Sequence, residues 1–142
     1  MSPSLSSYDG ASLSVTSGFP ESKYDNRHLE KALLQGFRAQ KVFDRIRLER
    51  NTLDNPLPLR IQAHIVDWEN VDHDRFFAGT FAGWNKMSVN FTLIDTKDDS
   101  VIGQFRIDGR SKGALSIGGR MKHVIIYITR EAAEYLKKFR SP

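Results

Sequence analysis

The sequence predicts an α+β fold, in which a mainly antiparallel or mixed sheet of about five strands carries two helices packed on one face. Five segments of the 142-residue chain alternate apolar and polar residues, which is the period of a strand with one solvated face. Two other segments, 25–40 and 120–139, repeat apolar residues every three or four positions, as amphipathic helices do. The resulting order β-α-β-β-β-β-α buries every apolar stripe when both helices share one face of the sheet.

The amino-terminal elements are a strand and a helix. Residues 1–12 are rich in serine and are expected to form a flexible leader, which leaves a single domain over residues 13–140. Residues 12–17 alternate leucine and valine with hydroxyl residues and predict a short strand. The helix over 25–40 is expected to begin at Asp25, because aspartate is a common capping residue.

Four strands and a second helix follow. Residues 42–50 and 59–68 alternate on either side of a connection that contains two prolines. Residues 87–95 and 101–109 alternate on either side of a short polar turn, so we expect them to form a hairpin. Over 120–139 the β-branched residues favour a strand, but the continuous apolar stripe at helical spacing decides for a helix.

The composition excludes several classes of protein. Lysine and arginine exceed aspartate and glutamate by 21 to 17, a mild excess that does not predict nucleic-acid binding. The absence of cysteine excludes disulfides, thiolate catalysis and zinc sites built on cysteine. No run of 18 apolar residues occurs, so we expect no membrane-spanning helix. The amino terminus lacks the pattern of a secretory signal, which indicates a cytoplasmic protein if Met1 is the native start and a removed signal otherwise.

A run of aromatic residues among glycines and alanines is the most unusual feature of the sequence. The candidate partner-binding residues in this run are Phe76, Phe77, Phe81 and Trp84. Large aromatic side chains between small residues are typical of contact anchors in protein interfaces. The same side chains could instead close the core over the end of the sheet, or insert into a membrane surface.

No pattern of residues predicts catalysis, a metal site or a cofactor, and we expect the protein not to be an enzyme. An acidic group lies at Asp67, Glu69, Asp72, His73 and Asp74, without the spacing of a calcium loop. The remaining histidines, His28, His64 and His123, are scattered. Glycine-rich stretches at 79–83 and 109–119 match no phosphate-binding loop.

A group of cations surrounds the second predicted strand. Its members are Arg38, Lys41, Arg45, Arg47, Arg50 and Arg60. A surface for single-stranded nucleic acid would interleave exposed aromatic residues with these cations, and here the aromatic residues concentrate elsewhere. We therefore expect a solvated strand face and no nucleic-acid partner.

The carboxy-terminal half resembles a bacterial envelope lipoprotein family of unknown function. The resemblance rests on "AGTFAGWNKMSVNFTLIDTKDDSVIGQFRIDGRSKG" and the helix that follows, at the positions Gly79, Gly83, Met87, Asp95, Gly103, Gly109, Ser111 and Arg120. It implies a fold similar to the amino-terminal domain of TolB and to parts of the curli secretion channel subunit. It also implies a periplasmic, outer-membrane associated module without catalysis. The signal and lipid-bearing cysteine of that family do not occur in this sequence.

We therefore expect a non-enzymatic structural or accessory component of a larger secretion or cell-envelope assembly. Its expected partners are other envelope or secretion proteins, with a homo-oligomer compatible with the sequence and membrane contact only through a lipid anchor outside this chain. The alternative is a periplasmic protein that binds a small ligand or lipid, with residues 76–84 as its lid.

Overall fold

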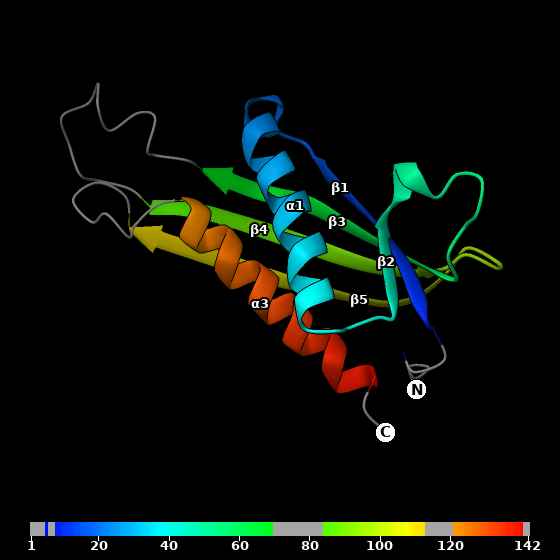
Figure 1. Cartoon of the computed structure of the whole chain (residues 1–142). Coiled ribbons are helices and arrows are strands. Elements are labelled where there is room, and N and C mark those ends of the chain that lie inside the picture. Colours follow the sequence, from blue (N-terminus) through cyan, green and yellow to red (C-terminus); the bar gives the residue numbers. More distant parts are fainter. Residues whose placement is uncertain (1–4, 6–7, 70–83, 113–120, 141–142) are drawn as a thin grey trace.

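The computed structural model describes residue 5 and residues 8–69, 84–112 and 121–140, and these confirm the predicted α+β class (Figure 1). In these ranges the strands are β1 (Gly10–Ser17), β2 (Arg45–Leu48), β3 (Leu59–Glu69), β4 (Trp84–Asp95) and β5 (Ser100–Lys112). The long helices are α1 (Lys23–Ala39) and α3 (Met121–Arg140). Two 3₁₀ helices, η2 (Pro20–Ser22) and η3 (Glu49–Asn51), lie in the connections.

The sheet is mixed, with the strand order β2-β1-β3-β4-β5. β1 lies second from one edge and runs parallel to both of its neighbours, β2 and the central strand β3. β3, β4 and β5 form an antiparallel meander, which confirms the predicted hairpin between the last two strands. β2 and β5 are therefore the two edge strands of the described sheet.

Both long helices cover the same face of the sheet, side by side, as predicted (Figure 1). The largest fully buried side chains of this layer are Leu13, Leu59, Ile61, Ile65, Met87 and Phe91 from the strands and Leu29, Leu33, Phe37, Ile125, Ile128 and Leu136 from the helices. Gly36 lets α1 approach α3 closely, because a side-chain carbon at this position would overlap Thr129. None of the described helices carries an apolar stretch long enough to cross a lipid bilayer.

The start of α1 differs from the prediction. The helix begins at Lys23, directly after η2, and Ser22 occupies the capping position that we assigned to Asp25. Asp25 lies inside the first turn and is only 5% exposed, because its carboxylate accepts a hydrogen bond from the indole of Trp68 at the end of β3. A partner 43 positions away thus decides the place of this aspartate.

The end of α1 is a Schellman turn. Lys41 adopts a left-handed backbone conformation, with φ of 53°. Its N–H donates to the carbonyl of Arg38 at 3.1 Å, and the N–H of Val42 donates to the carbonyl of Phe37 at 3.0 Å. These bonds satisfy carbonyl groups that the end of a helix leaves open.

The strand predicted over 42–50 is shorter in the structure. Val42 and Phe43 are buried in the turn that follows α1, and β2 has only four residues. Glu49 already begins η3. Strict alternation of apolar and charged residues covers only residues 45–49, and the charged residues Asp44 and Arg50 break it on either side. The predicted strand therefore extends past the pattern that supports it.

The first strand begins at Gly10, two residues earlier than predicted. Within the stretch 1–12, Leu5 and Tyr8 are buried. The hydroxyl of Tyr8 donates a hydrogen bond of 2.8 Å to Oδ2 of Asp95, the last residue of β4. Burial, together with this hydrogen bond, raises the pKa of Tyr8 to about 12.

Candidate functional site

The aromatic residues singled out in the sequence are not described by the structure, apart from one backbone position. Phe76, Phe77 and Phe81 lie outside the described residues. Trp84 is the first residue of β4, where only its backbone is described. Their assignment as partner-binding residues stays a prediction.

The edge formed by β5 is the longest strand edge in the described sheet. β5 has 13 residues and pairs along its length with β4, and within the described ranges no strand lies on its other side. An unpaired strand of this kind presents a row of main-chain donors and acceptors to another chain. Val101 on this strand is a large apolar side chain that is 56% exposed. The edge is therefore a candidate surface for strand pairing with a partner.

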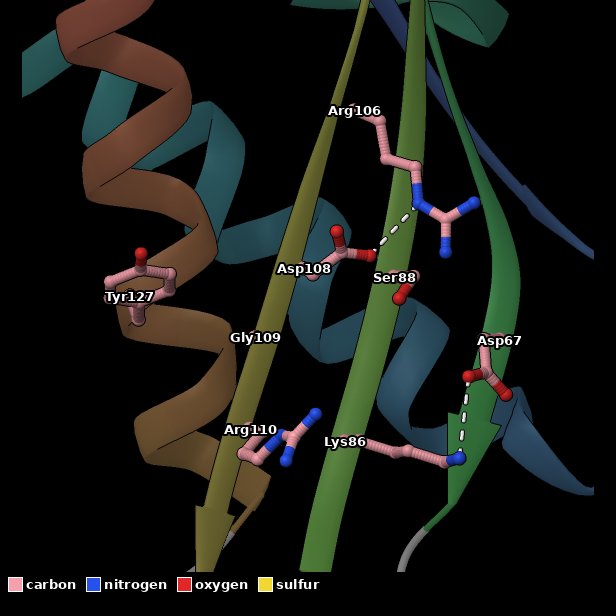
Figure 2. Close-up of a pocket in the computed structure, with 8 residues that line it drawn as sticks. All are labelled: Asp67, Lys86, Ser88, Arg106, Asp108, Gly109, Arg110 and Tyr127. Atoms are coloured by element: carbon pink, nitrogen blue, oxygen red, sulfur yellow. Dashed lines mark hydrogen bonds and ion pairs between the residues drawn. The ribbon is translucent and has the colours of Figure 1, made fainter.

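A polar hollow of about 550 Å³ lies along the same edge (Figure 2). It extends from Tyr127 on α3, across β5, to the open face of β4 and β3. The lining residues are Asp67, Lys86, Ser88, Arg106, Asp108, Gly109, Arg110 and Tyr127. The antiparallel register brings them together, since Ser88 lies opposite Asp108 and Lys86 opposite Arg110.

Four of the charged side chains in this hollow form ion pairs. Nε of Arg106 donates to Oδ1 of Asp108 at 2.8 Å, and Nζ of Lys86 lies 3.4 Å from Asp67 and 3.7 Å from Glu69. These side chains are between 39% and 66% exposed.

The acidic member on β5 has a perturbed pKa. Hydrogen bonds from Ser88 and Arg106 lower the pKa of Asp108, because both stabilise its ionised form. A carboxylate that acts as a general base works best when its pKa is raised toward neutral pH, which is the opposite change. Paired, water-exposed charges of this kind suit a contact surface better than a catalytic centre.

The predicted acidic group is only partly described. Asp67 and Glu69 face Lys86, whereas Asp72, His73 and Asp74 lie outside the described residues. Among the residues that the structure describes, no three metal-ligating side chains come together.

The described histidines lie apart from one another. Nδ1 of His64 lies 2.7 Å from Oγ1 of Thr16 on the open face of the sheet. His28 meets the ring of Tyr24 edge-on, with ring centroids 6.1 Å apart. His123 is exposed on α3. The three described histidines therefore contact separate local partners or solvent and do not form a common site.

The predicted basic strip is divided by the fold. Four of its members, Arg38, Lys41, Arg45 and Arg47, line a hollow of about 520 Å³ beside β2. Arg50 instead forms a two-pronged ion pair with Glu30 of α1, and Arg60 lies between Glu49 and Asp99. Neighbours in the sequence thus serve three different parts of the surface.

An aromatic stack fills the space between α3 and the β4–β5 hairpin. Phe91 stacks on Phe105 at 4.7 Å between centroids, Phe105 on Tyr135 at 4.1 Å, and Tyr135 contacts Phe139 at 5.0 Å. The pocket beside this stack holds about 30 Å³, room for on the order of one water molecule. This part of the helix–sheet interface is packed and cannot hold a lipid or a drug-sized ligand.

Several solved structures share this fold. A variant of PelC from Paraburkholderia phytofirmans, solved as a dodecamer, has a TM-score of 0.68 at 17% identity, covering 100% of this chain and 96% of PelC. A DUF330 protein from Xanthomonas campestris has a TM-score of 0.62 at 11% identity, covering 97% and 88%. A minor lipoprotein from Acinetobacter baumannii has a TM-score of 0.53 at 9% identity, covering 96% and 98%.

These likenesses define a class of fold that includes bacterial lipoproteins, in agreement with the resemblance read from the sequence. Identities this low establish the shared fold and no shared function. No protein-family model and no curated protein matches the sequence. The similarity to the TolB and curli subunit domains stays a prediction.

Proposed function

We propose that this protein is a non-enzymatic structural component of a bacterial cell-envelope assembly, and that it associates with copies of itself through the edge of β5. In this proposal the protein works in the periplasm, near the outer membrane, and a lipid anchor outside this chain provides its membrane contact. Phe76, Phe77, Phe81 and Trp84 would provide a further contact with other envelope or secretion proteins.

The length and openness of β5 carry the proposal. A 13-residue strand at the edge of a sheet is a liability for a monomer unless charges, bulges or a covering element protect it. Paired charges of Arg106 and Asp108 lie on its open face, and Val101 stays exposed on the strand. Edge pairing with another subunit would satisfy the outward main-chain groups and cover Val101.

The comparisons support self-association and an envelope location. Two solved PelC structures that share the fold are dodecamers, and other structures of the fold are bacterial lipoproteins. A ring of identical subunits uses two different surfaces of each copy in a head-to-tail contact. The described sheet has two unlike edges, long β5 and short β2, as such a contact requires.

The first test is the mass of the protein in solution. Sedimentation velocity at several concentrations should show a species several times heavier than the 16.2 kDa chain. A single monomeric species up to about 100 μM, where even weak contacts of low-micromolar affinity would be populated, contradicts self-association.

A further inference from the structure

A groove runs along the side of the molecule opposite β5, between α1 and the first two strands. Its volume is about 710 Å³. The apolar floor consists of Val15 of β1, Leu34 of α1 and Leu48 of β2, all partly buried against the core. We call this feature the α1 groove.

The main chain of β1 is open beside the α1 groove. β2 pairs only with residues 10–13 of β1, because it ends at Leu48 and the chain turns into η3. Residues 14–17 of β1 pair with β3 on one side, and no described strand pairs with them on the other. In a parallel strand, alternate residues direct both main-chain groups to the same side, so this half of β1 has donors and acceptors left for another strand.

The rim of the α1 groove carries an excess of positive charge. Arg50 neutralises Glu30 through two hydrogen bonds of 2.9 and 3.0 Å. Lys23, Arg27 and Lys31 follow one another at intervals of four along α1, and none of them forms an ion pair with a described residue. Like charges at this spacing destabilise a helix slightly. The charges of this row therefore do not support one another within the helix, and together they suit an anionic partner.

We propose that the α1 groove binds an acidic, extended segment of a partner protein, which adds as a strand to the open half of β1. About four residues, roughly 13 Å of extended chain, would pair with residues 14–17. Alternate apolar side chains of this segment would contact Val15, Leu34 and Leu48. Its carboxylates would face the cations of α1, so that main-chain pairing supplies affinity and charge supplies selectivity.

The shape of the site favours a peptide over other polyanions. A membrane surface is flat and does not reach the apolar floor of a concave groove. A single-stranded nucleic acid needs aromatic side chains on which its bases stack, and the described lining of the α1 groove contains none. Only an extended peptide uses the cations, the apolar floor and the open main chain together.

The test uses the full chain and a fluorescein-labelled peptide of alternating glutamate and valine. Fluorescence anisotropy should show saturable binding, and a peptide of alternating lysine and valine should bind at least tenfold more weakly. The triple variant Lys23→Glu/Arg27→Glu/Lys31→Glu should lower affinity for the acidic peptide at least tenfold. The single variant Arg27→Glu, which perturbs α1 least, should lower it at least threefold.

A matched variant on the other helix controls for net charge. Lys122→Glu/Lys137→Glu/Lys138→Glu changes the charge by the same amount at exposed positions of α3, and affinity should stay within twofold. Equal loss in both triple variants would show unspecific attraction and overturn the assignment of the α1 groove.

Main-chain pairing is tested separately. The acidic peptide with N-methylated valines keeps its charge but cannot donate main-chain hydrogen bonds from those residues, and it should bind at least tenfold more weakly. Equal binding of both forms would overturn strand addition. Preferential binding of anionic vesicles or of a single-stranded oligonucleotide, lost on charge reversal of α1, would also overturn the proposal. The solution mass of the protein without any peptide tests self-association through β5 separately, so failure of the groove and failure of self-association are distinguishable.

Discussion

The indole Nε1 of Trp68 donates a hydrogen bond of 2.8 Å to Oδ2 of Asp25, which ties the end of β3 to the first turn of α1. The ring of Trp68 also packs near the ring of Phe19, which lies just before α1, with 6.2 Å between the ring centroids. Both contacts hold the start of the helix against the sheet. They also set the position of α1, and hence of the cations along the α1 groove.

Loss of this hydrogen bond should lower stability. We expect Asp25→Ala to reduce the free energy of unfolding by about 1–2 kcal/mol, because a partly buried indole N–H loses its acceptor. Asp25→Asn keeps an acceptor oxygen and should cost less than half as much. Urea unfolding measures both, and equal losses in the two variants would show that the negative charge of Asp25, not its acceptor, stabilises the fold.

A second prediction concerns the contact between β5 and α3. A side-chain carbon at Gly109 would lie 2.9 Å from Cγ1 of Val124 and 3.1 Å from Cγ1 of Ile128. Gly109→Ala should therefore lower the free energy of unfolding by about 1–3 kcal/mol, since the helix must shift.

Gly103 on the same strand provides the control for this prediction. A carbon added there lies 3.5 Å from Leu93, an ordinary contact distance. Gly103→Ala should change stability by no more than about 0.5 kcal/mol. If thermal unfolding shows the same loss of stability in both variants, the close contact between α3 and β5 at Gly109 is contradicted.

A third prediction concerns the turn after α1. Because Lys41 has a positive φ, Lys41→Gly removes a steric cost and should stabilise the protein by about 0.5–1 kcal/mol. Gln40→Gly, one position earlier with φ of −91°, should destabilise it instead. The same sign for both variants in urea unfolding would argue against the left-handed turn.

The raised pKa of Tyr8 predicts a loss of stability at alkaline pH. The folded protein holds the phenolic proton up to about pH 12, whereas the unfolded chain releases it near its ordinary value of 10.0. Between these values the folded state binds more protons, so the free energy of unfolding falls as pH rises, by up to about 2 kcal/mol. Tyr8→Phe lacks this ionisation, and its stability relative to the parent protein should rise by this amount between pH 9 and 11.5. A constant difference between the two over this range would contradict the raised pKa.

The elements of the fold could be predicted from the sequence because each carries its own period. The stripe from Met121 to Leu136 defines α3, and the alternation from Met87 to Leu93 defines the core of β4, without any knowledge of partners. The strand order could not be predicted, since nothing local states that β1 lies between β2 and β3.

The polar hollow and the α1 groove could not be predicted either, because their residues come together only in the folded chain. Lys86 and Arg110 become neighbours only through the register of the hairpin, and Val15, Leu34 and Leu48 come from three separate elements. The one signal that was present is the spacing of Lys23, Arg27 and Lys31, which places three cations on one face of a helix.

The most direct measurement for the central claim is native mass spectrometry of an edge variant beside its matched control. Val101→Lys/Gln104→Lys adds two charges to exposed positions of β5, whereas Leu53→Lys/Gln35→Lys adds the same two charges at exposed positions away from it. Self-association through β5 predicts an oligomer for the parent protein and the control, and a monomer of unchanged circular dichroism for the edge variant. An edge variant that assembles as fully as the parent protein would contradict the assignment of β5 as the assembly surface.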